Sequence, residues 1–331
     1  MGKSVAANAF SFLIVAMIVL AGVVAWGQKQ FRAPGPLAED AVVVIEQGAN
    51  LRQATAKLVA AGAISNEQIF RLGARFSERD SSLKFGEYLI PASASMEEIL
   101  NIISSGRSID YRVTIPEGWY TAEIAARINA NEDLVGEIEN LPPEGYLAPN
   151  TYSFLRGDTR QSVIDRMAAE QTRILDEAWE ARDPDLPIAS KEELLILASI
   201  VESEAGGAGE WGLVASVFYN RIRANMRLEA DATIRYGLTD GTERLRRGLR
   251  ESELARETAY NTYQIRGLTP TPISNPGEAA IRATANPETS PYYYFVLDGS
   301  GGHAFAENYD EHRRNVAAWR RIEAERAAAQ E

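Results

Sequence analysis

A run of nineteen residues without a charge, Ala9–Gly27, constrains the fold of this chain more than any other feature. Ser11 is the only residue in it with a hydroxyl or amide side chain. Because about 20 apolar residues form a helix long enough to cross a bilayer, we predict one transmembrane helix over residues 9–27. A cleaved signal peptide is the alternative, but its apolar region usually has about 7 to 15 residues. In addition, "VVA" ending at Ala25 is a poor cleavage site.

The charges on either side of this segment hardly decide its orientation. Lys3 and the terminal amine precede it, whereas Lys29 and Arg32 follow it, and orientation depends on an excess of basic residues on one side. The stretch "RAPGPLAED" then has two prolines, a glycine and no apolar periodicity. We therefore expect residues 28–40 to form an extended linker.

Composition excludes several classes of function. The chain has 34 basic and 46 acidic residues, a net charge of −12, whereas nucleic-acid binding depends on an excess of Lys and Arg. It has no cysteine, which excludes disulfide scaffolds, thiolate metal sites and cysteine nucleophiles. With only His303 and His312 available, we expect no histidine-rich metal site, although carboxylate sites for hard cations stay open.

The sequence after the linker alternates strand and helix patterns, which predicts an α+β fold. Residues 41–107 form a first module of strand, two helices, strand and helix. Its first strand is the β-branched "AVVVI", and Asn50 and Ser95 are candidate helix N-caps. We expect its second strand to end at Pro91 and its last helix at Gly106.

Residues 108–331 form the second and larger domain. We expect a strand over Tyr111–Ile115, a helix from Thr121 and a long helix from about Thr159 to Ala181. The stretch from "MRLEADATIRYGL" to "PISNPG" is predicted to be largely loop because it is rich in turn formers. A short helix around Glu278–Thr284, the strand "YYYFVL" and a charged helix from about Asn308 complete this domain.

The stretch "LLILASIVESE" is predicted to form an apolar helix that has two glutamates, Glu202 and Glu204, at its end. Apolar residues occupy every face from Leu194 to Val201, which is typical of a buried helix. Glu202 at its inner end would resist ionisation, and a carboxyl group with a raised pKa is suited to general acid catalysis. A structural ion pair between Glu202 and an arginine is the alternative. We expect Glu204 to point away from Glu202 as a solvated or helix-end residue.

Several segments resemble, in order, the conserved blocks of the endolytic murein transglycosylase family, the YceG-like proteins. The resemblance runs from about Val42 to His312 and rests on the segments "EGYLAPNTYSF", "LASIVESEAGGAGEWGLVASVFYNRI", "MRLEADATIRYGL", "AYNTYQIRGLTPTPISNPGEAAIRATANP" and "YYYFVLDGSGGHAF". It implies a single-pass protein of the bacterial cytoplasmic (inner) membrane, with residues 1–8 in the cytoplasm and the catalytic domain, 108–331, on the outer side. It also implies that residues 41–107 are LysM-like, although a spacer or docking module stays open for them.

The resemblance implies an enzyme that cleaves peptidoglycan glycan strands internally, without a cofactor or metal, with Glu202 as the catalytic acid. One carboxyl group suffices for lytic cleavage, because it protonates the bridging oxygen and then takes the proton of the muramic C6 hydroxyl as a 1,6-anhydro ring closes. A non-catalytic, membrane-anchored peptidoglycan-binding scaffold is the alternative. A hydrolase would need a second carboxylate, for which Asp231 is the candidate. Partners in the cell-wall synthesis machinery stay open, because the sequence shows no interface.

Other polar and aromatic residues in these blocks are candidates for holding sugars, because hydroxyl, amide and aromatic groups suit sugar hydroxyls and pyranose rings. The alternative for each residue is a contact that stabilises a loop. For Ser300 and His303, which lie in "DGSGGH", the alternative is a hairpin turn. The candidates are Asp231, Tyr236, Tyr260, Asn261, Thr262, Tyr263, Ser300 and His303.

Overall fold

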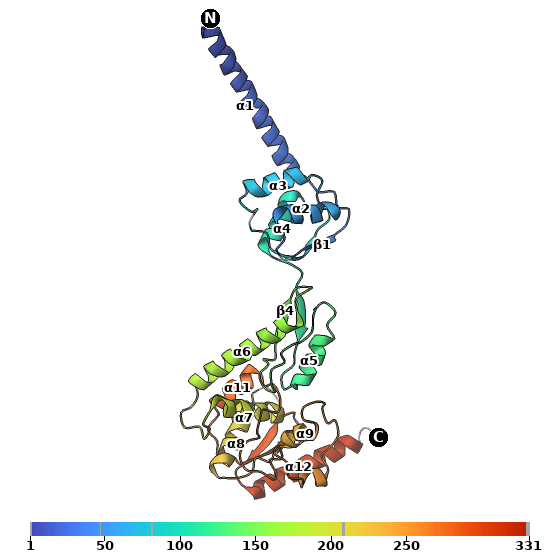
Figure 1. The fold of residues 1–331 in the computed structure, drawn as a ribbon. Helices are drawn as coiled ribbons and strands as arrows, with labels where there is room; N and C mark the ends of the chain where they lie inside the picture. The colour runs from blue at the N-terminus through green and yellow to red at the C-terminus, as the bar shows by residue number, and fades with distance from the viewer. Residues whose placement is uncertain (1, 47, 81, 207–208, 329–331) are drawn as a thin grey trace. The chain divides into compact units, whose positions relative to one another are not determined.

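The computed structural model describes residues 2–46, 48–80, 82–206 and 209–328, with the side chains of residues 2–9 and 11 outside the description. Predictions that fall on Met1, Gly207 and the other omitted residues lie outside the described part of the chain. The chain divides into two compact units, Met1–Tyr111 and Arg112–Glu331, coloured blue to green and green to red in Figure 1.

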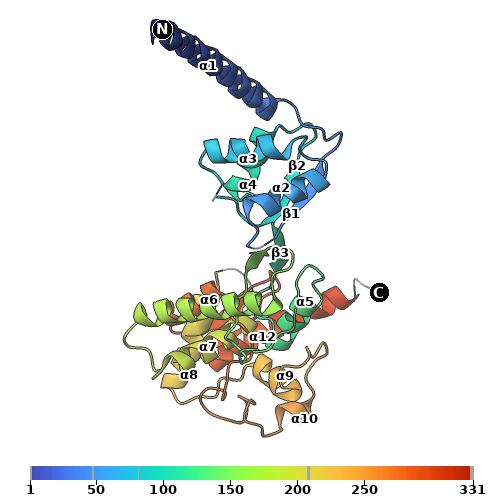
Figure 2. The ribbon, with the colours of Figure 1, turned by 45° about the horizontal axis from the view of Figure 1, so that its top comes forward.

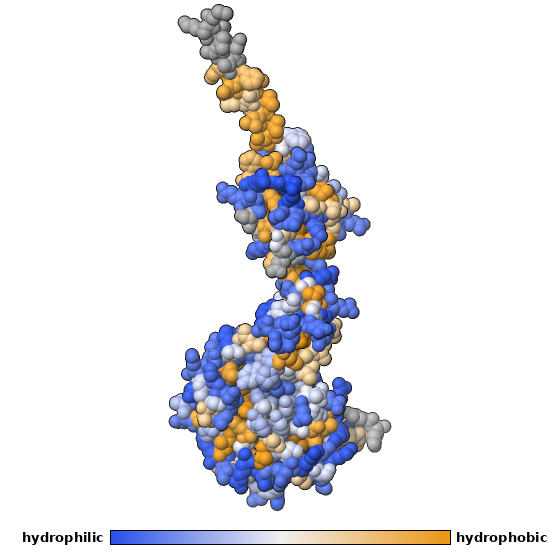
Figure 3. Space-filling model, viewed as in Figure 1, coloured by the Kyte–Doolittle hydropathy of each residue, from blue (hydrophilic) through white to orange (hydrophobic). Residues whose placement is uncertain are grey.

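The first unit begins with one long apolar helix. Helix α1 covers Gly2–Arg32, so the helix continues past the predicted segment into the expected linker. Among the described residues, Phe12–Arg32 is the one stretch long and apolar enough to cross a membrane. Its side chains from Phe12 to Trp26 are exposed, and its surface is largely apolar in Figure 3.

The rest of the first unit is a two-stranded sheet covered by three helices. Strands β1 (Ala41–Ile45) and β2 (Gly86–Ile90) are antiparallel, and the helices are α2 (Leu51–Ala60), α3 (Glu67–Phe76) and α4 (Met96–Ser105). The caps are those predicted: Asn50 and Ser95 each form a capping box, and Gly106 ends α4 in the left-handed conformation. A mixed helix and strand fold is thus confirmed, whereas the LysM likeness of this unit stays a prediction.

The second unit is built around helix α7 (Lys191–Glu204). Helices α6 (Arg160–Glu180), α8 (Trp211–Arg223), α9 (Asp231–Thr239) and α11 (Glu278–Ala285) pack against it. Figure 1 labels all of these helices, and Figure 2 shows α6, α7 and α8 side by side from a second direction. The remaining helices are α5 (Thr121–Asn129), α10 (Glu251–Leu254) and α12 (Tyr309–Ala328). Strands β3 (Tyr111–Thr114) and β4 (Thr151–Phe154) pair, and so do β5 (Tyr294–Leu297) and β6 (His303–Ala306).

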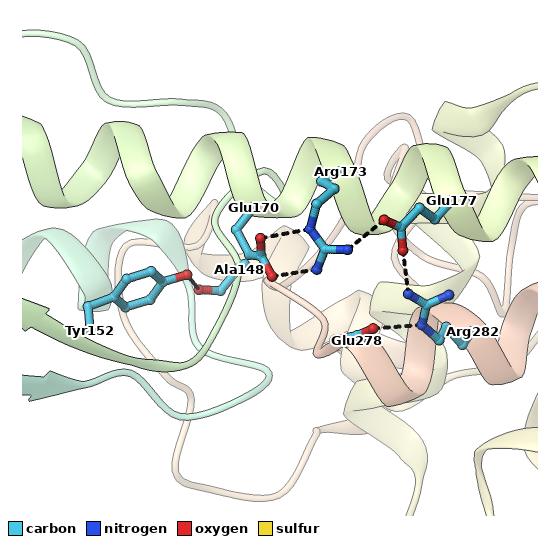
Figure 4. A network of polar contacts seen from close by, with 7 residues as sticks. All are labelled: Ala148, Tyr152, Glu170, Arg173, Glu177, Glu278 and Arg282. Carbon is cyan, nitrogen blue, oxygen red and sulfur yellow. Dashed lines mark hydrogen bonds and ion pairs between the residues drawn. The ribbon is translucent and has the colours of Figure 1, made fainter.

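An ion-pair network joins α6 to α11 (Figure 4). Arg173 binds Glu170 and Glu177, whose second oxygen accepts a 2.7 Å bond from Arg282. Arg282 also binds Glu278 in the first turn of α11. Exposed pairs contribute little one by one, but this network fixes the start of α11, and the residue before that helix contacts Glu202.

The prediction that the stretch from "MRLEADATIRYGL" to "PISNPG" is largely loop is wrong in part, because α9 and α10 lie within it. Helix α9 has Ala230 at its N-cap, which makes no side-chain cap bond, and Gly237 in its interior, so local signals for a helix are weak. Tertiary packing favours the helix instead: a Cβ on Gly237 would lie 2.7 Å from Cβ of Tyr260.

Candidate active site

Helix α7 carries two carboxylates from the core to the surface of the second unit. Ser190 caps its start by accepting a hydrogen bond from the Glu193 amide, and every side chain from Leu194 to Val201 is buried. Residues two apart on a helix differ in direction by about 200°. Glu202 and Glu204 therefore face opposite sides of the helix end, and each meets a different set of neighbours.

Glu202 lies between the loop after β3 and the start of α11. Its Oε2 accepts a 3.0 Å hydrogen bond from the Gly277 amide, and a Cβ on Gly118 would be 3.4 Å from its Cγ. The pKa of Glu202 is raised to about 7, chiefly by burial and in smaller part by the negative charge of Glu117, while the Gly277 bond lowers it. No arginine is among its hydrogen-bond partners in the described residues, so the predicted alternative of an arginine pair finds no support there.

Glu204 ends α7 and faces α9. Its Oε1 accepts a 3.0 Å hydrogen bond from the Ala232 amide in the first turn of α9. The pKa of Glu204 is raised to about 7, chiefly by burial and in part by the charge of Asp231, whereas the Ala232 bond and Arg235 lower it. The side chain is half-buried, and Glu204 is the last residue of α7, so of the two expectations for Glu204 the helix-end position is the one that holds.

A cavity of about 340 Å³ opens beside Glu204, at the lower end of the sizes typical of ligand sites. Glu204, Asp231, Tyr263 and His303 all line it. These residues come from α7, α9, the loop after α10 and strand β6, which are far apart in the sequence. The structure thus gathers three of the predicted sugar-binding residues around Glu204, and Glu202 is not among the residues that line this cavity.

Hydrogen bonds fix the polar groups of this cavity. The Tyr263 hydroxyl donates to Oδ1 of Asp231 at 2.8 Å. Glu210 accepts from the His303 amide and binds its Nδ1, both at 2.8 Å, and the His303 ring meets the Phe295 ring edge-on. Because Nδ1 is held by Glu210, Nε2 is the ring nitrogen that His303 can offer to a ligand.

The other predicted sugar-binding residues lie elsewhere. Tyr236 is buried between the rings of Tyr120 and Tyr260, and the Tyr260 hydroxyl bonds to Oγ1 of Thr271. These contacts match the structural alternative for both tyrosines.

Asn261 and Thr262 are fully buried, and Ser300 lies in a turn. The Asn261 amide donates to three carbonyls of the preceding segment, and Thr262 binds the Ala230 amide and the Thr233 hydroxyl. Ser300 bonds to Asp298 in the β5–β6 hairpin turn. The polar groups of these three residues therefore serve the protein's own loops.

Two further acids of the second unit, Glu117 and Glu144, were not predicted from the sequence. Glu117, in "PEGW", lies so close to Gly277 that a Cβ there would be 2.1 Å from its Oε1. Glu144 accepts hydrogen bonds from Thr121 and from Nδ2 of Asn275, and burial raises its pKa to about 7. No apolar pattern surrounds either acid in the sequence, so only the folded contacts indicate their burial or proximity.

Comparisons with known proteins agree on one family. A model described as the YceG-like family matches residues 43–318. A Streptococcus pneumoniae (strain D39) protein named endolytic murein transglycosylase is 29% identical over 322 residues, covering 83% of this chain, and this chain spans only 57% of that relative. A Bacillus subtilis (strain 168) protein of the same name is 27% identical, with coverages of 76% and 77%.

One solved structure is also similar. A crystal structure of a YceG-like protein from Listeria monocytogenes matches with a TM-score of 0.52 and 27% sequence identity. The match covers 83% of this chain and 98% of that one.

Proposed function

The chain belongs to the YceG-like family, and from this membership we propose that it is a lytic transglycosylase that cleaves peptidoglycan strands internally. The observation that carries the proposal is the cavity in which Glu204 meets Asp231, Tyr263 and His303. It combines a carboxyl group of raised pKa with hydroxyl, carboxylate and imidazole groups that suit a sugar. The names of the relatives, endolytic murein transglycosylase, indicate the same reaction.

Two carboxyl groups compete for the role of the acid. The sequence pattern favours Glu202, and the geometry favours Glu204, because Glu204 lines the cavity. Both have a pKa raised to about 7, so proton affinity does not separate them. We propose Glu204 as the acid and leave Glu202 as the sequence-based alternative, since a general acid must reach the oxygen that it protonates.

The proposed reaction uses one carboxyl group twice. Protonated Glu204 gives its proton to the oxygen that bridges N-acetylmuramic acid and N-acetylglucosamine, and the bond from that oxygen to C1 breaks. The carboxylate then takes the proton of the muramic C6 hydroxyl, whose oxygen closes on C1 as a 1,6-anhydro ring. Water is not consumed, and Glu204 ends the cycle protonated, ready for the next bond.

Asp231 has two effects in this scheme. Its negative charge helps to keep Glu204 protonated before the reaction. The same charge stabilises the positive charge that develops at C1 as the bond breaks. The bond from Tyr263 holds the Asp231 carboxylate in place. His303, held through Nδ1 by Glu210, is assigned to a sugar hydroxyl.

The place of action follows from the substrate. We propose that α1 anchors the chain in the bacterial cytoplasmic membrane and that the second unit lies on the outer side, where peptidoglycan is built. Cleavage near the membrane would trim or terminate new glycan strands. Glycan binding by the first unit also belongs to this proposal.

The pH dependence of the rate tests the assignment of the acid. Because Glu204 must begin protonated and its pKa is about 7, we expect kcat/KM to fall as the pH rises through about 7. The measurement is the release of soluble fragments from purified peptidoglycan by the full-length protein, from about pH 5 to about pH 9. The Glu202→Gln protein should show the same midpoint; a midpoint that disappears with Glu202→Gln would transfer the role to Glu202.

A further inference from the structure

Helix α3 in the first unit exposes two large apolar side chains on one stripe. Phe70 and Ala74 of this helix are fully buried in the core of the unit, whereas Leu72 is 52% and Phe76 83% exposed. Residues four apart on a helix lie one above the other, so the exposed pair forms a continuous apolar stripe. Such a stripe next to polar residues marks an interaction surface more often than an isolated exposed leucine does.

The stripe lies beside the helix that we assign to the membrane. Helix α3 contacts α1, and a Cβ on Gly73 would be 2.3 Å from Cε2 of Phe31 in the last turn of α1. Gly73 lies one turn from Phe76 on the same side of α3. Figure 1 shows α3 at the base of α1, so the exposed stripe on α3 lies near the end of the apolar helix.

The level of this contact matches a membrane interface. Trp26 of α1 is 57% exposed, and exposed tryptophans of membrane helices gather at the headgroup level. Phe31 follows five residues later, a rise of about 7 Å along the helix. Helix α3 thus meets α1 about 7 Å beyond Trp26 on the aqueous side, which is within the headgroup layer of roughly 5 to 8 Å on each side of a bilayer.

One basic residue ends the neighbouring apolar helix and another flanks the stripe. Arg75 is exposed on its other side, and Lys29 lies in the last turn of α1. Arg71 pairs with Glu67 across one turn of α3. Leucine and phenylalanine bordered by arginine are typical of helices that lie in the headgroup region of a bilayer containing anionic lipids.

We propose that Leu72 and Phe76 insert into the surface of the bilayer from which α1 emerges, so that α3 lies in the headgroup region. The proposal rests on the proposed membrane anchoring by α1. A monotopic contact of this kind would hold the first unit against the membrane, so that residues 33–40 would not act as a free tether. The stripe of Leu72 and Phe76 thus contacts lipid, and its apolar side chains and the neighbouring Arg75 are the features that favour this partner.

Fluorescence quenching by lipids tests this proposal, because the chain has no cysteine of its own. Single variants Ser77→Cys, Phe85→Cys and Val19→Cys of the full-length protein are labelled with an environment-sensitive dye. They are placed in vesicles of phosphatidylethanolamine and phosphatidylglycerol, with or without lipids spin-labelled near the headgroup or along the acyl chain. Ser77 follows the stripe and leaves it intact, Phe85 is a 45% exposed control on the same unit, and Val19 reports on α1.

We expect the headgroup-level quencher to cause loss of emission at position 77 and not at position 85, and the acyl-chain quencher to cause loss at position 19. Adding Leu72→Ser and Phe76→Ser should abolish the loss at position 77 while leaving that at position 19. Quenching at 19 without quenching at 77 would overturn the insertion of α3 and leave the anchor intact. Equal quenching at 77 and 85 would also overturn it, and no quenching at 19 would overturn the anchor and the insertion together.

Discussion

Replacing Glu204 with glutamine should lower the rate of glycan cleavage by about 10²- to 10⁴-fold, the usual contribution of a general acid. The amide keeps an oxygen to accept the Ala232 bond, but it has no acidic proton to give to the leaving oxygen. The rate is measured as soluble fragments released from purified peptidoglycan by the full-length protein. The variant should still bind peptidoglycan, because the rest of the cavity is unchanged.

The matched control is Glu202→Gln, which changes a carboxyl group with a similarly raised pKa on the same helix. It can keep its bond from Gly277, and we expect a much smaller loss of rate. The reverse order of the two losses would assign catalysis to Glu202. If the folded wild-type protein releases no more fragments than a protein-free control, the chain is the non-catalytic peptidoglycan-binding scaffold. If it releases them and neither variant lowers the rate, neither glutamate is the acid.

Replacing Asn275 with alanine should destabilise the second unit by about 3 kcal/mol or more, since several buried polar groups would lose their partner at once. Asn275 is fully buried. Its Nδ2 donates to the Trp119 carbonyl, to Oγ1 of Thr121 and to Glu144, and its Oδ1 accepts from the Leu147 amide. This one amide thus ties the loop before α11 to the start of α5 and to the segment before β4.

Denaturant unfolding followed by tryptophan fluorescence measures this effect, because four of the five tryptophans lie in the second unit. Asn150→Ala is the control: this side chain is exposed and its Oδ1 accepts only from the amide of the next residue among the described contacts. We expect it to change the free energy of unfolding by no more than about 0.5 kcal/mol. Equal effects of the two substitutions would contradict the role given to Asn275.

Local signals were enough to predict much of the fold. Asn50, Ser95 and Gly106 delimit helices at the residues expected, because caps satisfy backbone groups within one turn and need no tertiary contact. The all-apolar face of α7 likewise indicated its burial. Strand β4 was missed, since it depends on pairing with β3 and its sequence, "TYSF", follows a run of turn formers.

The sequence predicted less of the candidate site than of the fold. The alternation of residues on α7 indicated that Glu202 and Glu204 diverge, but it could not show which one faces a cavity. That depends on Ala232, on Tyr263 and on His303, which approach α7 from segments remote in the sequence. Asn261 and Thr262 illustrate the opposite error, because polar residues in a family block suit a ligand and a buried loop contact equally well.

The most direct test of the central claim is the chemistry of the cut ends. Full-length protein is incubated with purified peptidoglycan beside its Glu204→Gln variant, and the new glycan ends are identified by mass spectrometry. We expect 1,6-anhydro-muramic ends, lighter by one water than reducing ends, with the active protein and none with the variant. Reducing ends would show that water attacks C1, which would contradict the lytic mechanism and make the protein a hydrolase.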